Sequence, residues 1–270
     1  MTSFHVIAGN SASPAYPLIR KIGLTDLNQA LTKGFDDFRA MPSHLAFLCI
    51  VYVVIGIALY PLTTVGGNVL PLLFPLLSGF ALIGPFAAIG LYEVSRRREL
   101  GLPYSWPYAF DVLRSPAIPS ILAVGLLLMA IFLLWLASAQ SLYERLFGDM
   151  PPKSLPAFLT EVTTTPEGRT LMILGCAIGF VFALTTLSVS VVSFPLLLDR
   201  DVGAAVAVHT SVRTMFLNPV MMALWGLIVA VALAFGMLTL FVGLVVVIPI
   251  LGHSTWHLYR RIVAPAADQR

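Results

Sequence analysis

Two histidines near the end of the chain have a spacing that suits a metal site. His253 and His257 are four residues apart in a predicted helix, so both imidazole rings can face the same side. Such a pair can ligate a transition metal or contribute to haem ligation. His44 and His209 would complete the site only if the fold gathered them there. The alternative is that His253 and His257 anchor the helix end or form hydrogen bonds to neighbouring helices.

Charged residues at the ends of apolar segments form the second group of candidates. Glu93 could face a water-filled cavity, or it could form an (i, i+3) ion pair with Arg96. Asp199 can pair with the adjacent Arg200 or with a basic residue of another segment. Asp201 is placed to cap the helix that follows it. The residues predicted to be functional, or to make polar contacts between segments, are Glu93, Asp199, Asp201 and Arg213.

The sequence lacks the common motifs of phosphate binding and catalysis. It contains no Walker phosphate loop, GxGxxG, HExxH or GxSxG pattern. Cys49 and Cys176 lie in apolar segments without a CxxC or Cys/His spacing, so we expect buried free thiols. The polar segments are also too short for a separate catalytic domain. We therefore expect a protein that is not an enzyme and that needs no cofactor.

The composition excludes a water-soluble globular domain. Of the 270 residues, 58% are hydrophobic and only 11% are Asp, Glu, Lys or Arg, whereas soluble domains carry about 25% charged residues. The formal net charge is +3, but the basic residues lie in short segments beside apolar runs, a pattern that orients helices in a bilayer. We therefore expect an all-α polytopic membrane bundle, with the lipid bilayer as its partner and no nucleic-acid ligand.

Six apolar runs are long enough to cross a bilayer, which takes roughly 20 residues per helix. They cover residues 45–60, 69–94, 116–139, 170–198, 219–235 and 237–257. A tight turn is expected near Gly236, between the last two runs. Residues 140–169 are expected to form the only long loop, and residues 199–217 a helix along the membrane surface. Residues 24–263 would thus form a single six-span domain.

The basic residues predict the orientation of these spans. Thirteen Lys and Arg residues would lie on one side of the membrane and three on the other, namely Arg145, Lys153 and Arg169. Cytoplasmic loops carry the excess of basic residues in membrane proteins. We therefore expect residues 140–169 on the non-cytoplasmic side and cytoplasmic tails at residues 1–23 and 264–270.

One order of features recurs three times, at residues 24–98, 103–201 and 202–261. Each copy has an amphipathic stretch, an Arg shortly before a Pro, a span, a connection and a second span that contains a Pro. The Arg and Pro pairs are Arg39 with Pro42, Arg114 with Pro116 and Arg213 with Pro219, and the prolines of the second spans are Pro85, Pro195 and Pro249. This order predicts three parallel helix-plus-hairpin repeats around an axis near the membrane normal. The alternative is that any six-span protein shares basic ends and prolines.

Three stretches of sequence resemble a known family. They are FPLLLDRDVGAAVAVHTSVR at 194–213, LGHSTWHLYR at 251–260 and IGPFAAIGLYEVSRR at 83–97. They are similar to the DUF2189 family of predicted bacterial integral membrane proteins. The resemblance extends over residues 20–263 and is most specific in the last 70 residues. It implies a multi-span protein of the bacterial inner membrane, and it brings no established catalytic or binding residues.

These patterns favour a role that depends on helix surfaces. Ionisable residues are scarce at the span centres, where transporters need polar groups. The leading expectation is therefore a non-enzymatic accessory or assembly partner of another membrane complex. The alternative is a small-molecule carrier or channel with a pathway between the three repeats, and the second alternative is a haem or metal protein that uses His253 and His257. Function is expected where the second helices of the hairpins meet.

Overall fold

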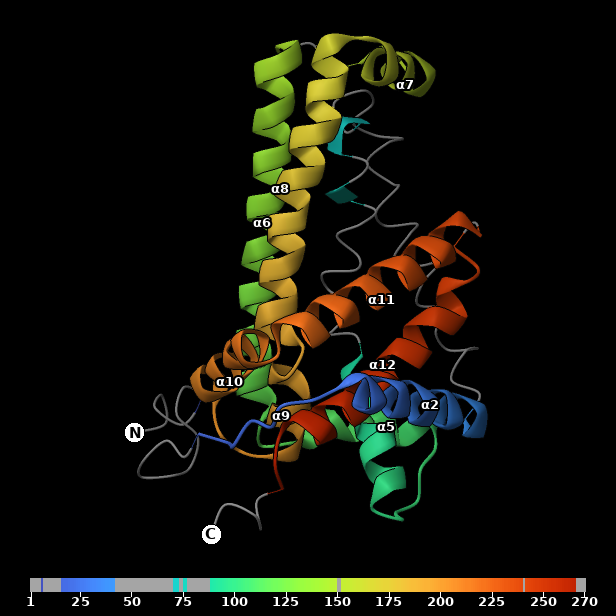
Figure 1. The fold of residues 1–270 in the computed structure, drawn as a ribbon, viewed down its shortest axis with the longest axis vertical. Coiled ribbons are helices and arrows are strands. Elements are labelled where there is room, and N and C mark those ends of the chain that lie inside the picture. Colours follow the sequence, from blue (N-terminus) through green and yellow to red (C-terminus); the bar gives the residue numbers. More distant parts are fainter. Residues whose placement is uncertain are drawn as a thin grey trace. The chain divides into compact units, whose positions relative to one another are not determined.

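The structure is a computed structural model that describes residues 16–41, 88–149, 152–239 and 241–265, together with residue 6 and short pieces at 70–72 and 75–76. The helices in these residues are α2 (Leu24–Ala40), α5 (Ile89–Glu99), the 3-10 helix η2 (Trp106–Arg114), α6 (Ile118–Phe147), α7 (Leu155–Thr164), α8 (Pro166–Ser190), α9 (Ser193–Asp199), α10 (Ala204–Leu217), α11 (Pro219–Leu238) and α12 (Leu244–Ile262) (Figure 1). The only extended pairing in this part of the chain is a single bridge between Ile19 and Val263. The predicted all-α class is confirmed for the described residues.

Among the described residues, three stretches of helix are long and apolar enough to cross a membrane. They are α6, the stretch Pro166–Asp199 that contains α8 and α9, and α11. They correspond to the third, fourth and fifth predicted spans. Large apolar side chains such as Leu126, Ile173 and Val231 are exposed on them, as expected for helices whose solvent is lipid.

The other predicted spans have different outcomes. The first, at 45–60, lies outside the described residues, and so does most of the second, at 69–94. The sequence predicts the sixth at 237–257, but α11 continues to Leu238 and α12 begins only at Leu244. Among the described helices α12 is not an apolar candidate for a span, because its second half carries two histidines and two arginines.

The turn predicted near Gly236 lies a few residues further along the chain, between Leu238 and Leu244. Gly236 lies inside α11, where a Cβ atom would come within 2.5 Å of Cδ2 and 3.0 Å of the nitrogen of Leu244. Its small size therefore serves the close packing of the two helices. In the turn itself, the Gly243 amide donates a hydrogen bond of 2.9 Å to Thr239 Oγ1.

The prediction of one long loop at 140–169 is wrong, because much of this segment is helical. The third run continues as α6 to Phe147, and α7 and the start of α8 follow. The prolines mark helix starts: α7 has a proline in its first turn, and its cap Ser154 accepts a hydrogen bond from the Ala157 amide. Pro166 is the first residue of α8. Proline is tolerated in a first turn because those amides lack an intrahelical partner.

Backbone contacts divide the chain into two compact units. One comprises residues 1–51, 84–127 and 187–270, and the other residues 52–83 and 128–186. In the second unit, Trp135 of α6 stacks on Phe182 of α8, with 6.4 Å between the ring centroids. Tyr143 of α6 meets Phe158 of α7 edge-on at 6.2 Å. Aromatic contacts thus join α6 to α7 and to α8.

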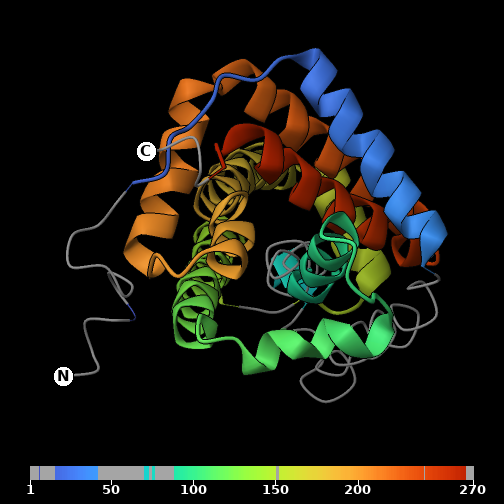
Figure 2. The ribbon, with the colours of Figure 1, turned by 90° about the horizontal axis from the view of Figure 1, so that it is seen from below.

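In the first unit, three helices from distant parts of the chain pack against one another. We call α5, α9 and α12 the closing helices, and each of them contacts the other two. We call α2, η2 and α10 the leading helices, and each of them packs mainly on one closing helix: α2 on α12, η2 on α5 and α10 on α9. Figure 2 shows the leading helices outside the closing helices. Charged segments that are far apart in the sequence thereby become neighbours.

Small residues allow these helices to approach closely. A Cβ atom on Gly34 of α2 would lie only 2.5 Å from the backbone nitrogen and 2.7 Å from the Cα of Ser254 in α12. A Cβ atom on Gly252 would lie 2.5 Å from Cδ1 of Leu91 in α5. The backbone of α12 therefore lies directly against α2 on one side and against side chains of α5 on another.

The approach of α2 to α12 gives a first prediction, for Gly34→Ala. Alanine favours an isolated helix by about 1 kcal/mol over glycine, but here its Cβ meets backbone atoms that cannot move aside. We expect a net destabilisation of about 1–3 kcal/mol, measured as thermal unfolding of the purified protein in detergent. Gly23→Ala is the matched control, because no atom lies within 4 Å of a Cβ at that position. Equal stability of the two variants would contradict the observed packing of α2.

Candidate functional site

The two histidines that the sequence singles out lie buried on α12, and each contacts a different leading or closing helix. His257 Nε2 lies 2.8 Å from Oδ2 of Asp37 in α2. His253 Nδ1 lies 2.8 Å from Oγ of Ser95 in α5. We call Asp37, Ser95, Arg98, His253 and His257 the Asp37 cluster. It joins α2, α5 and α12 at one buried point.

The carboxylate of Asp37 is the acceptor at the centre of this cluster. Ser95 Oγ donates to Asp37 Oδ2 at 2.6 Å, and the Arg98 guanidinium forms an ion pair with Oδ1. Burial raises the pKa of Asp37, but the hydrogen bonds from His257, Ser95 and Arg98 and the charge of His257 outweigh that effect, so the pKa is lowered overall. The group is therefore held as a carboxylate.

The hydrogen bonds also decide which nitrogen of His253 carries its proton. Ser95 has one hydroxyl hydrogen, and Asp37 takes it, so Ser95 Oγ must accept from the Nδ1–H of His253. The Nε2 atom of His253 is buried and makes no hydrogen bond to the described residues.

The metal or haem hypothesis gains no further ligand from the described residues. No group of three His, Cys, Asp or Glu side chains in them could hold a metal ion. The sequence has three further histidines. His5 and His44 lie outside the described residues, and the ring of His209 packs on Tyr16, with 4.7 Å between the ring centroids. The hydrogen bonds of His253 and His257 fit the alternative of contacts between helices.

Glu93 forms the centre of a second polar network on another side of α5. Its side chain is only 4% exposed and accepts hydrogen bonds from Nε and Nη2 of Arg96 at 2.8 and 3.0 Å. Nε of Arg97 donates to it at 3.0 Å. The (i, i+3) pair predicted for Glu93 and Arg96 is thus present, with the second arginine in addition.

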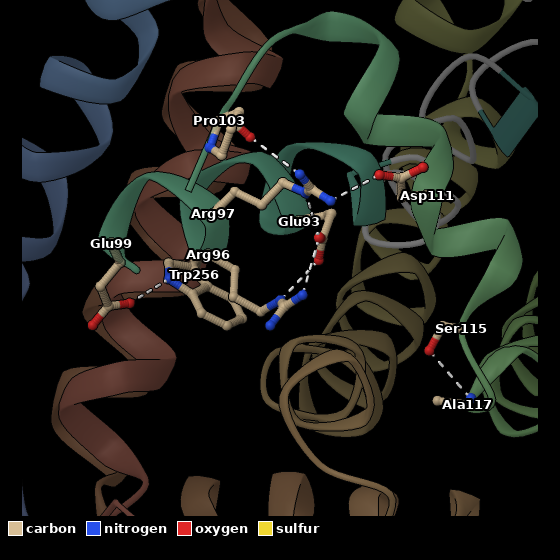
Figure 3. A network of polar contacts seen from close by, with 9 residues as sticks. All are labelled: Glu93, Arg96, Arg97, Glu99, Pro103, Asp111, Ser115, Ala117 and Trp256. Atoms are coloured by element: carbon tan, nitrogen blue, oxygen red, sulfur yellow. Dashed lines mark hydrogen bonds and ion pairs between the residues drawn. The ribbon is translucent and has the colours of Figure 1, made fainter. Parts of the chain in front are cut away.

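Arg97 connects this network to η2. It donates to Asp111 Oδ2 at 2.8 Å and to the Pro103 carbonyl at 3.1 Å, and its guanidinium lies 4.2 Å from the ring centroid of Tyr108. Figure 3 shows Arg97 between Pro103 and Asp111, with Glu93 facing Arg96. The charges of Glu93 and Asp111 are therefore neutralised within α5 and η2.

Asp199 lies at the end of α9, where it accepts from Tyr259 Oη at 2.6 Å. It also pairs with Arg200 at 3.4 Å and with Arg260 at 3.5 Å. The N-cap position of α10 is Gly203, two residues after Asp201. The φ angle of Gly203 is 78°, a conformation that glycine adopts readily, so the chain enters α10 by a glycine turn.

The network around Glu93 and the polar contacts of Asp199 lie beside a cavity of about 370 Å³, which we call the charged cavity. It lies between α5, η2, the start of α6 and the end of α9. Four arginines and four acidic residues line it, together with a few small or apolar residues: Glu93, Arg96, Arg97, Asp111, Val112, Arg114, Ser115, Pro116, Ala117, Leu197, Leu198, Asp199, Arg200 and Asp201. Glu93, Asp199 and Asp201, which the sequence predicts as one group, thus share this cavity. Arg213 is exposed on α10 and does not line it.

Sequence reasoning misses Asp37 and Asp111, the two acceptors on the leading helices. A positional signal marks both of them, since Asp37 stands five residues before Pro42 and Asp111 five residues before Pro116. In the third leading helix the same position, five residues before Pro219, is the buried Thr214. Comparing the three segments position by position would therefore have found both acceptors.

Residues 73–199 match the DUF2189 family, described as a predicted integral membrane protein. No curated protein and no solved structure matches the chain. The DUF2189 match confirms the resemblance inferred from the sequence, but over a shorter range than 20–263, and it ends before the last 70 residues.

The DUF2189 match covers one of the two polar groups almost completely. It includes the lining of the charged cavity from Glu93 to Asp199, and of the Asp37 cluster it includes only Ser95 and Arg98. Together with the three apolar helices, the match identifies the chain as an integral membrane protein.

The Asp37 cluster gives a second prediction, for Asp37→Asn. Removing the carboxylate leaves Arg98 and His257 without their acceptor, and breaking a buried ion pair costs about 3–5 kcal/mol. We expect the lower half of that range because Arg98 is 33% exposed. The measurement is thermal unfolding in detergent at pH 7, and Asp36→Asn, at the exposed neighbouring position, is the control.

The same pair of proteins tests the lowered pKa of Asp37. A depressed folded-state pKa adds stability above the ordinary pKa of a carboxyl group, and this stability is lost as the pH falls through the folded-state value. The difference in melting temperature between the parent protein and Asp37→Asn should therefore shrink as the pH falls below about 4. A difference that keeps growing as the pH falls below about 4 would contradict a lowered pKa of Asp37.

Proposed function

We propose that this protein is a carrier that binds a small polar solute in the charged cavity. The observation that supports this proposal is the cavity itself, about 370 Å³ in volume and lined by four arginines and four acidic residues. This volume lies at the lower end of the range of small-molecule sites.

The cavity favours a carrier over an accessory subunit. The case for an accessory role is that the span centres offer few polar groups. The structure supplies charged groups at the closing helices α5 and α9 instead, close to the place where the sequence predicts function. The side chains there are held in defined positions by hydrogen bonds of 2.8 to 3.1 Å, which is the preorganisation that a binding site needs.

We further propose that the chain crosses the bacterial inner membrane six times as the three repeats 24–98, 103–201 and 202–261. The helix contacts that support this are cyclic, because the leading helix of each repeat packs on the closing helix of the repeat before it: α2 on α12, η2 on α5 and α10 on α9. Three repeats around an axis near the membrane normal would produce this pattern. The closing helices, and the charged cavity with them, would then lie at the cytoplasmic face, where most of the basic residues are.

The orientation gives a third prediction, tested in a protein in which Cys49 and Cys176 are replaced by Ala. Single cysteines are introduced by Lys153→Cys and by Lys33→Cys. We expect an impermeant maleimide added to intact cells, with an outer membrane made permeable, to label the Lys153→Cys protein and not the Lys33→Cys protein. Labelling of Lys33→Cys alone would show the opposite orientation, and labelling of neither or both would contradict an odd number of spans between the two sites.

The carrier proposal gives a fourth prediction. A thermal-shift screen of charged metabolites, with the purified protein in lipid nanodiscs, should find a solute that raises the melting temperature. Reconstituted liposomes should then take up the labelled solute. We expect Arg96→Gln to reduce both effects by about tenfold or more, since a hydrogen bond to a charged group contributes about 1.5–3 kcal/mol. Arg213→Gln removes a positive charge from the exposed surface of α10, outside the cavity, and should leave the thermal shift and the uptake unchanged.

Two results together would contradict the carrier proposal. If no solute stabilises the protein, and purification in mild detergent yields a stoichiometric partner protein whose binding survives Arg96→Gln, the carrier proposal is wrong and the accessory role is supported.

A further inference from the structure

We infer that the charged cavity binds the oxyanion group of its ligand, a carboxylate or a phosphate, through Arg96 and Arg114. This inference rests on the proposed function, because it assigns the chemical class of the solute. The observations that support it are the ion pairs and hydrogen bonds that the charged groups of the cavity already make with one another. The numbers of arginines and acidic residues are equal, so their pairing decides the preference.

Three of the acidic groups are occupied by donors from the protein. Glu93 accepts three hydrogen bonds from two arginines. Asp111 accepts from Arg97 on Oδ2 and faces Arg114 with Oδ1. Asp199 accepts from Tyr259 and pairs with arginines, one of which, Arg260, does not line the cavity. A cationic ligand would have to displace these donors.

Two guanidinium groups, by contrast, have hydrogens to spare. Arg96 uses Nε and Nη2 for Glu93, and its Nη1 makes no hydrogen bond to the described residues. The Arg114 side chain is 89% exposed and forms a 3.6 Å ion pair with Asp111. A guanidinium has five N–H donors in a planar fork that matches a carboxylate or phosphate.

The backbone at the cavity wall adds to this preference. Ser115, Pro116 and Ala117, which line the cavity, lead directly into the 30-residue helix α6. The first turn of a helix carries the positive end of its dipole, which favours a nearby anion. The helix end and the two guanidinium groups therefore act in the same direction.

The rest of the lining indicates how the ligand continues beyond its oxyanion. Val112, Leu197 and Leu198 form an apolar part of the wall. On η2, next to Arg114, Phe110 and Leu113 are 56% and 71% exposed, as expected for a helix at a membrane surface. The oxyanion could thus belong to a soluble metabolite or to a lipid headgroup, which offer the same chemistry to the arginines.

The test uses the full-length protein in nanodiscs of phosphatidylcholine. Succinate and inorganic phosphate are the soluble probes, titrated by calorimetry at low salt. For the lipid source, nanodiscs with and without phosphatidylglycerol are compared, and the lipid retained after exchange into phosphatidylcholine is measured by mass spectrometry. We expect binding by at least one probe class, weakened about tenfold or more in Arg114→Gln and less in Arg114→Lys. Because Arg114 is exposed, its replacement should leave the melting temperature of the ligand-free protein unchanged.

The outcomes separate this inference from the carrier proposal. If no anion binds, or if Arg114→Gln and the control Arg213→Gln bind every probe as the parent protein does, the inference is overturned. If a cationic solute binds and is transported instead, the inference fails while the carrier proposal stands. Retention of phosphatidylglycerol that depends on Arg114, without uptake of any soluble anion, would support the inference and refute the carrier proposal.

Discussion

The buried carboxylate of Asp37 is the constraint on which the first unit depends. An ionised group that is removed from water must be paired and hydrogen-bonded, or its burial would cost several kcal/mol. Asp37 meets this requirement with donors from two other helices, Ser95 and Arg98 of α5 and His257 of α12. Since none of these partners lies on its own helix, α2 can satisfy Asp37 only when it is docked. The close contact of Gly34 with Ser254 gives the same docking its steric fit.

The position of α5 links this constraint to the charged cavity. One side of α5 supplies Ser95 and Arg98 to Asp37, and another side supplies Glu93, Arg96 and Arg97 to the cavity. The 11 residues of this helix therefore carry both networks, and a helix of three turns has little freedom to rotate without breaking one of them. The Asp37 cluster thus determines how α5 presents its arginines, although it does not line the cavity itself.

The sequence predicts features that depend on neighbouring residues and misses those that depend on residues far apart in the chain. Hydropathy identifies α6, α8 with α9, and α11, because a span is a local property of about 20 residues. The Glu93 and Arg96 pair is also local. Asp37 is missed because its partners Ser95 and His257 are 58 and 220 residues away, and an aspartate in an amphipathic stretch looks like a solvated one. The predictions of a long loop at 140–169 and of a turn near Gly236 differ from the structure for another reason. They interpret proline and glycine as helix breaks, whereas the prolines begin α7 and α8 and Gly236 packs α11 closely on α12.

The equivalent positions on the leading helices explain why the cavity lies beside α5. Five residues before each proline stand Asp37, Asp111 and Thr214. The two aspartates pair with neighbouring arginines of α5, Arg98 and Arg97, whereas Thr214 satisfies its hydroxyl by donating to the Thr210 carbonyl. A buried aspartate on α10 would need a cation from α9, but the arginine after α9, Arg200, already binds the carbonyl of Ala264. Only the two leading helices that meet an available arginine carry an aspartate at this position, so charged pairs form on both sides of α5, and the side that remains open to a ligand is the one lined by Arg96 and Arg114.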